Sequence, residues 1–82
     1  MSDEVAYAYD VLETFANAMR KVRDQPGYFL KFLYEYLEKI DVLMDAVEVV
    51  TKEEHLGIVG EVMKASVEMI GSCLKVVVML EK

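Results

Sequence analysis

The chain has 82 residues, with one cysteine, one histidine and a formal net charge of −6. A chain of this length forms one domain and buries only about 60% of its unfolded surface on folding. One cysteine excludes an internal disulfide, and one cysteine with one histidine cannot supply a Cys/His zinc site. The acidic balance disfavours nucleic acid and anionic membranes as partners, because both bind through lysine and arginine.

The apolar content points to self-association. Apolar residues make up 55% of the sequence, above the roughly 45–50% that is typical of globular domains. A small domain has little interior for them, so we expect some to contact a second copy, in a homodimer or higher homo-oligomer. No uncharged run approaches the ~20 residues of a membrane span, and the acidic N-terminus does not resemble a signal peptide. With a lone thiol, these features predict a cytoplasmic protein.

The first predicted helix covers residues 3–24. Its apolar residues recur every three or four positions, which is the spacing of one helix face: Val5, Ala8, Leu12, Phe15, Met19 and Val22. The sequence Asp24-Gln25-Pro26-Gly27 follows. Proline disfavours helix at the residue before it and glycine permits a tight turn, so a break is predicted here.

The second predicted helix covers residues 28–50, with a wide apolar arc. The centre of the arc is the set Leu30, Leu33, Leu37, Ile40, Met44 and Val47. A second set widens it: Phe29, Phe32, Tyr36, Leu43 and Val50. An arc this wide contacts more than one neighbour, which makes this the central helix. Within the second set, Phe29, Phe32 and Tyr36 are predicted to be core or dimer interface, or else a groove for a foreign peptide or an apolar ligand.

The third predicted helix covers residues 52–81. Thr51 and Glu54 match a capping box, which predicts a helix start. The inner face is expected to carry Leu56, Val59, Met63, Ser66, Ile70, Cys73, Val77 and Leu80. Gly71-Ser72 is a candidate break, because this helix would outrun the first and leave an apolar end without cover. Small residues also recur along it, which favours close helix packing: Gly57, Gly60, Ala65, Ser66, Gly71 and Ser72.

These segments predict one all-α domain over residues 1–82. The expected architecture is a three-helix up-down-up bundle, a helical hairpin plus a long C-terminal helix, completed as a homodimeric helical bundle. The predicted interface consists of Phe29, Phe32, Tyr36, Leu43, Val50, Ile70, Val77 and Leu80.

Two charged groups are candidate docking surfaces. The first, an acidic docking surface, consists of Glu38, Asp41, Asp45, Glu48, Glu53 and Glu54. It is interpreted either as a site for a basic partner or a divalent cation, or as a solvated face. The second is the basic cluster Arg20, Lys21 and Arg23 at the end of the first helix, where cations complement the helix dipole. Alternatively, this cluster contacts the acidic end of another copy.

No catalytic constellation can be assembled from the sequence. His55 stands ~16 Å or more along the same predicted helix from Ser66, Ser72 and Cys73, and no Glu-x-x-His spacing for a carboxylate metal centre occurs. We therefore expect no enzyme and no cofactor. The predicted function is a small, non-catalytic interaction or assembly module, an adaptor, inhibitor or structural subunit, that acts as a homo-oligomer and contacts another protein. The alternative is a binder of a small apolar ligand between helices.

Overall fold

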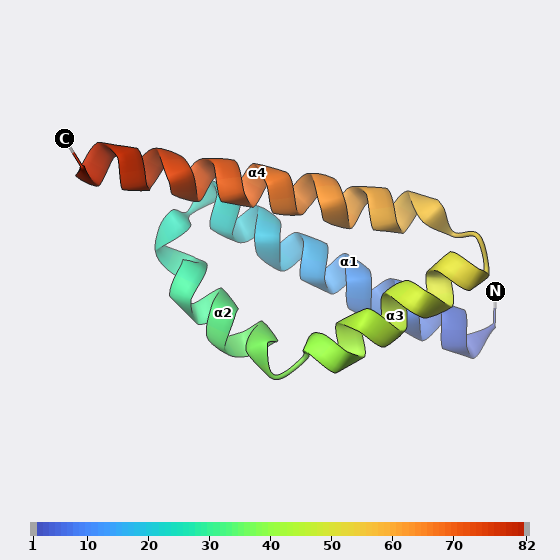
Figure 1. Ribbon diagram of the computed structural model, residues 1–82. Helices are drawn as coiled ribbons and strands as arrows, with labels where there is room; N and C mark the ends of the chain where they lie inside the picture. Colours follow the sequence, from blue (N-terminus) through green and yellow to red (C-terminus); the bar gives the residue numbers. More distant parts are fainter. Residues whose placement is uncertain (1, 82) are drawn as a thin grey trace.

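The structure is a computed structural model that describes residues 2–81. Across these residues the chain forms four α-helices and no strand, so the predicted all-helical class is confirmed. Helices α1 (Asp3–Asp24) and α4 (Leu56–Leu80) lie side by side and run in the same direction. Between them the chain returns through η1 (Pro26–Tyr28), α2 (Phe29–Leu37) and α3 (Ile40–Lys52) as a bent arm (Figure 1).

Helix α1 begins and ends on strong local signals. The Ser2 hydroxyl accepts a hydrogen bond from the Val5 amide at 3.2 Å, which satisfies one free N–H of the first turn. Asp3 and Glu4 lie in the first turn, while Lys21 and Arg23 lie in the last, so charges at both ends complement the helix dipole. The helix ends where Pro26 opens the 3-10 turn η1.

The return arm is two helices instead of the single helix expected over residues 28–50. The break lies at Glu38 and Lys39, where Lys39 adopts φ −106° and ψ 9° and starts α3. Its amide donates to the Tyr36 carbonyl at 3.0 Å, a 3-10 bond that tightens the end of α2. Neither residue is proline or glycine, so the sequence carried no local signal for this bend.

The segment between α3 and α4 forms the C-terminal cap of α3. The predicted capping box at Thr51 and Glu54, which would start a helix, is therefore wrong. Thr51 lies inside α3, and Glu54 follows it with a left-handed φ of 60°. The His55 amide donates to the Val50 carbonyl at 2.8 Å, and the Glu54 amide donates to the Thr51 carbonyl at 3.1 Å. This pair of bonds is the Schellman motif, which usually places glycine where Glu54 stands.

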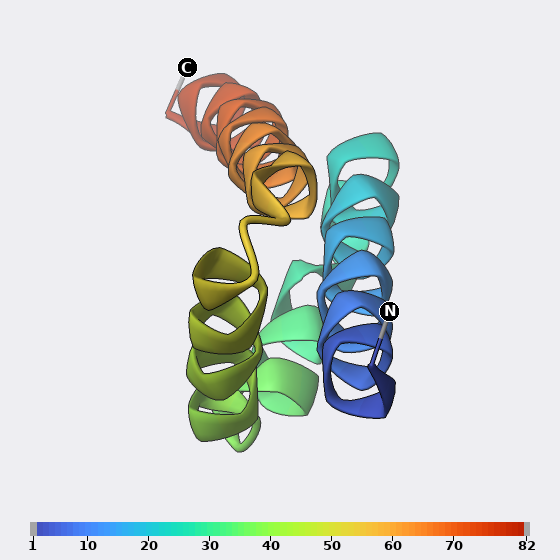
Figure 2. The same ribbon diagram turned by 90° about the vertical axis from the view of Figure 1, so that its right-hand side faces the viewer.

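Helix α4 is continuous through Gly71 and Ser72, so the candidate break there is absent. Its C-terminal end extends past the end of α1, and Figure 1 shows the last turns without a neighbouring helix. Viewed along the molecule, α1, α3 and α4 stand at three corners, with α2 behind them (Figure 2). The overhang carries apolar side chains into solvent, as every residue from Leu74 to Leu80 is exposed.

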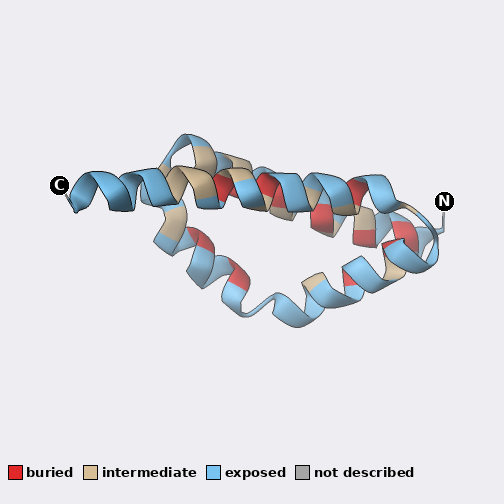
Figure 3. Cartoon of the chain, turned by 45° about the horizontal axis from the view of Figure 1, so that its top comes forward, coloured by how far each residue is buried: buried red, intermediate tan, exposed pale blue. Residues whose placement is uncertain are grey.

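Two apolar clusters hold the helices together, and both are built on α1. Near its start, Ala8 and Leu12 pack with Ala46, Val50 and Ile58. Near its end the second cluster joins α1, α2 and α4, and it consists of Ala16, Met19, Val22, Phe32, Tyr36, Ala65 and Met69. In Figure 3 the buried segments lie on all four helices, while the C-terminal end of α4 carries none.

The buried face of α1 largely follows the sequence expectation, but those of the later helices do not. In α1 the buried residues are Val5, Ala8, Leu12, Ala16, Met19 and Val22, with Phe15 half-buried. In the return arm the expected centre of the arc is exposed: Leu30, Leu33, Leu37, Ile40, Met44 and Val47. Its expected edge supplies the core instead. In α4, Ile58, Ala65 and Met69 are buried, whereas Leu56, Met63, Ile70, Val77 and Leu80 of the expected inner face are exposed.

Candidate functional site

Helix α4 presents a second apolar face that its own chain leaves uncovered. We call this face the α4 seam and define it by seven residues: Leu56, Gly60, Met63, Val67, Ile70, Leu74 and Val77. They alternate by four and three, which is the heptad spacing of a coiled-coil seam. The six side chains beyond glycine are 47–68% exposed. Large exposed apolar patches often mark interaction sites, which makes the α4 seam the candidate site.

The charged residues of α4 lie away from the seam. Glu61, Lys64, Glu68 and Lys75 are spaced by three, four and seven, so they share one side of the helix. Glu68 on that side pairs with Arg23 of α1 at 3.5 Å. Two positive and two negative charges cancel, and no charged residue occupies a seam position. Another apolar helix could therefore contact the seam without burying a charge.

Gly60 lies on the α4 seam, while Gly57 and Gly71 lie on the side of the helix that carries Lys64. A Cβ added at Gly57, Gly60 or Gly71 would meet no atom within 4 Å. Glycine inside a helix costs up to about 1 kcal/mol relative to alanine, so packing within the chain gives no reason for these glycines. Of the small residues expected to permit close helix packing, Ala65 does so against α1, since it is buried in the second cluster.

An apolar groove lies on the inside of the bent arm. It is lined by apolar and aromatic side chains, namely Phe15, Phe32, Leu33, Tyr36, Leu37, Ile40 and Leu43. The rings at its base are close-packed, with the centroid of Phe15 4.9 Å from that of Tyr36 and 5.7 Å from that of Phe32. Such aromatic contacts fix the rings in place. The groove is therefore a preformed apolar surface beside the break between α2 and α3.

The exposed surface is large for the size of the protein. A compact monomer of 9.4 kDa would expose about 5,000 Å², whereas this chain exposes 6010 Å². Its radius of gyration is 14.1 Å, against about 12 Å for a compact chain of this length. The excess of about 1,000 Å² is comparable to the ~800 Å² that each partner contributes to a standard protein interface.

The predicted interface residues divide into two groups. Phe32, Tyr36 and Val50 are buried within the chain, and Phe29 and Leu43 pack half-buried against the core. These five have little surface to offer a partner. The other three, Ile70, Val77 and Leu80, are exposed on α4. Sequence reasoning missed Val67 and Leu74, although their heptad spacing from Ile70 and Val77 was a usable signal.

The predicted acidic docking surface is only partly assembled. Asp45, Glu48 and Glu53 line one hollow together with Glu4 of α1. Lys52 lies in the same hollow and pairs with Glu48 at 3.2 Å. Among residues 2–81, no three acidic, histidine or cysteine side chains stand close enough to hold a metal ion.

The remaining members of the acidic docking surface lie apart from this hollow. Glu38 falls in the break between α2 and α3, Asp41 begins α3, and Glu54 occupies the turn before α4. The hollow's lining includes none of these three.

Each member of the predicted basic cluster has a local partner. Arg20 donates to the Asn17 side chain at 2.8 Å, and Lys21 Nζ stands 4.2 Å from the centroid of the Tyr28 ring. The Arg23 guanidinium contacts Asp24 at 2.9 Å and holds the pKa of that carboxyl below its usual value, chiefly through the hydrogen bond. The same bond raises the pKa of Arg23.

Arg23 also ties α1 to α4. Its backbone carbonyl accepts a hydrogen bond from the Ser72 hydroxyl at 2.7 Å, while its guanidinium reaches Glu68. The contacts seen for the basic cluster are therefore within the chain, and two of them join α1 to α4.

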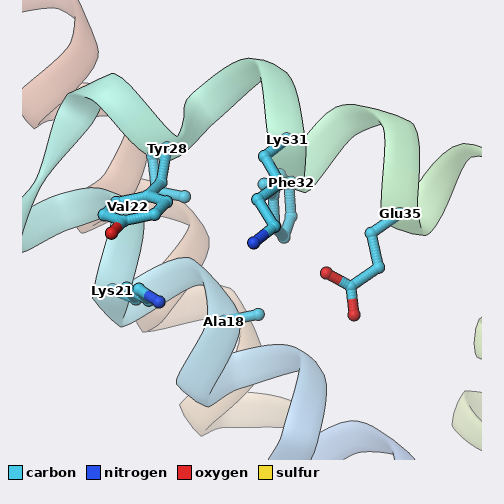
Figure 4. Close-up of a pocket in the computed structure, with 7 residues that line it drawn as sticks. All are labelled: Ala18, Lys21, Val22, Tyr28, Lys31, Phe32 and Glu35. Atoms are coloured by element: carbon cyan, nitrogen blue, oxygen red, sulfur yellow. The ribbon is translucent and has the colours of Figure 1, made fainter.

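A small cleft separates the end of α1 from the start of α2. In Figure 4, Lys21 and Ala18 project from α1 toward Lys31, Phe32 and Glu35 of α2. The lining mixes two lysines and one glutamate with apolar side chains, and Tyr28 closes one end. Nearby, burial among apolar groups raises the pKa of the Tyr36 hydroxyl.

Comparisons with known proteins assign no family: no protein-family model matches the chain, and neither a curated protein nor a solved structure shows significant similarity to it. No helix within residues 2–81 combines the length and the apolar character needed to cross a membrane.

Proposed function

We propose that the protein is a small, non-catalytic interaction or assembly module that acts as a homo-oligomer. The observation that carries the proposal is the α4 seam, an uncharged helical face that the chain exposes over its whole length. Helix faces with apolar residues every three or four positions bind other helices through their side chains. The exposed excess of about 1,000 Å² supports an interface of ordinary size.

A protein partner explains the exposed residues better than a small ligand does. The exposed apolar side chains of the α4 seam extend in a line from Leu56 to Val77, whereas small-molecule sites are concave. The groove at Phe15 and Leu37 supports the alternative function, a binder of a small apolar ligand. Native mass spectrometry separates the two, because a ligand binder retains an added mass and an assembly module shows multiples of the chain mass.

Light scattering coupled to size exclusion, over a dilution series, tests the proposal. We expect a particle of twice the 9.4 kDa chain mass or a higher multiple at micromolar concentration, dissociating on dilution. Burial of the α4 seam in both copies stabilises the oligomer by roughly 25 cal/mol per Å² of apolar surface, less the cost of association. A mass of one chain at every concentration up to the millimolar range would contradict the proposal.

A further inference from the structure

We propose that the α4 seam pairs with the α4 seam of a second copy, and that the two helices run antiparallel. This inference rests on the proposed function and names its partner and geometry. One surface pairing with itself about a two-fold axis is the commonest arrangement of homo-oligomers. The seam provides about three heptads of uninterrupted apolar positions, which is enough for knobs-into-holes packing between two helices.

The register follows from overlapping the whole of both helices. A heptad seam has two kinds of position, called a and d. In an antiparallel pair of helices, each a residue lies opposite a d residue of the other helix. Among the registers that pair these positions, the one in which the two copies of Leu56–Leu80 overlap most completely places Gly60 opposite Val77 of the second copy. Met63 then lies opposite Leu74, and Val67 lies opposite Ile70 near the two-fold axis. This register covers the overhanging end of α4 in each copy.

Packing at Gly60 favours the antiparallel orientation over the parallel one. In a parallel pair every residue faces its own copy, so Gly60 would face Gly60 and leave a void in the seam. Voids in apolar interfaces forfeit dispersion contacts and destabilise them. In the antiparallel pair the β-branched Val77 fills the space above Gly60, where no atom of the chain itself comes within 4 Å.

The charge distribution favours the same orientation. The N-terminal end of α4 lies beside the acidic hollow of Glu4, Asp45, Glu48 and Glu53, and among the described residues that line this hollow Lys52 is the one cation. A parallel pair would bring two such hollows to one end, where like charges repel. The antiparallel pair places the two hollows at opposite ends of the assembly. It therefore avoids this repulsion, which is strongest at low salt.

Glutamate substitutions on the seam test which face is used. Val67→Glu and Ile70→Glu are made at side chains that are exposed within the chain, so each monomer is expected to fold. Each copy brings one buried charge to the middle of the seam, and we expect the dissociation constant to rise at least 100-fold. The matched control is Tyr7→Glu on α1, because Tyr7 is 66% exposed and Val67 is 68% exposed. Circular dichroism checks that all three variants remain helical.

Cysteine pairing tests the orientation. In a Cys73→Ser background, two further variants are made separately, Gly60→Cys and Val77→Cys. The antiparallel register predicts disulfide-linked dimers when the two variants are mixed under oxidised glutathione, and little linkage in either variant alone. In that register the two copies of residue 77 stand ~25 Å apart along the axis, beyond the reach of a disulfide. Disulfide-linked dimers of each variant alone would overturn the antiparallel orientation.

The outcomes separate this inference from the proposed function. A dimer whose dissociation constant is unchanged by Val67→Glu and Ile70→Glu would overturn the α4 seam while leaving self-assembly intact. A wild-type chain that is monomeric at every concentration would remove both. If Val67→Glu and Ile70→Glu each lose the dimer while Tyr7→Glu keeps it, the result supports the pairing of α4 with α4.

Discussion

The Leu12→Ala variant is expected to unfold with a free energy about 3 kcal/mol lower than that of the wild-type chain. Leu12 is 0% exposed and stands where α1 meets both α3 and α4, in contact with the cluster of Ala46, Val50 and Ile58. Truncation removes apolar contact area and leaves a cavity between three helices. Urea unfolding at one fixed protein concentration measures the effect, since self-association makes apparent stability depend on concentration.

The control for Leu12→Ala is Leu30→Ala. Leu30 is exposed on α2, and a surface truncation of this kind changes stability by about 0.5 kcal/mol or less. If Leu12→Ala cost less than about 1 kcal/mol, the packing of α1 against α3 and α4 would be wrong. Cores that collapse around a deleted side chain still lose its transfer free energy, so a near-zero effect has no explanation within this fold.

The Phe32→Ala variant is expected to be destabilised by about 3 kcal/mol or more. Phe32 is one of the two buried side chains, with Tyr36, through which α2 joins the second cluster. Its ring centroid lies 5.1 Å from that of Tyr36 and 5.7 Å from that of Phe15. Its removal would weaken the docking of α2 on α1, because Tyr36 would then be the one buried side chain of α2. The loss of near-ultraviolet circular dichroism from the tyrosines and phenylalanines accompanies the drop in urea midpoint.

Two variants serve as controls for Phe32→Ala. Phe32→Leu keeps most of the apolar volume and is expected to cost clearly less than Phe32→Ala. Tyr34→Ala lies in the same helix, but Tyr34 is exposed, so its effect should stay near zero. Equal effects of Phe32→Ala and Tyr34→Ala would show that α2 does not dock through Phe32.

The sequence specified helices more securely than it specified which face of each helix is buried. In α1 the charged residues between the end turns share one side of the helix, so the period located Leu12, Met19 and Val22 on the inner face. In α2, α3 and α4 apolar residues cover well over half of the circumference. Two different faces then satisfy a helical period equally well. The structure buries the aromatic edge of the return arm and leaves its leucine-rich centre exposed.

The breaks show a similar limit. Pro26 and Gly27 mark the end of α1 by restricting or freeing the backbone, and the sequence predicted a turn there. Nothing in the residue types of Glu38 and Lys39 opposes helix, so that break was invisible in the sequence. The Thr51–Glu54 pattern matched a helix start but stands at a helix end, because a capping box is a short and common motif. Glu54 adopts the left-handed conformation without being glycine.

The candidate site was predictable in kind but not in position. An apolar content of 55% and the uncovered end of the last helix both indicated a second chain. In the structure, exposed apolar residues on α4 account for both features. The predicted interface nevertheless included Phe32, Tyr36 and Val50, which the core needs. A surface for a partner cannot be separated from a core by periodicity, because both require apolar side chains at the same spacing.

Native-state hydrogen exchange of the amides of residues 74–80 tests the central claim most directly, namely that another copy covers the α4 seam. Every residue of this segment is exposed in the chain alone, so the segment would open with little free energy and exchange almost as fast as an unfolded chain. We expect instead protection comparable to that of the α1 amides at micromolar concentration, and its loss in Val67→Glu while α1 stays protected. Rapid exchange of residues 74–80 in the wild-type protein, alongside a protected α1, would contradict the claim.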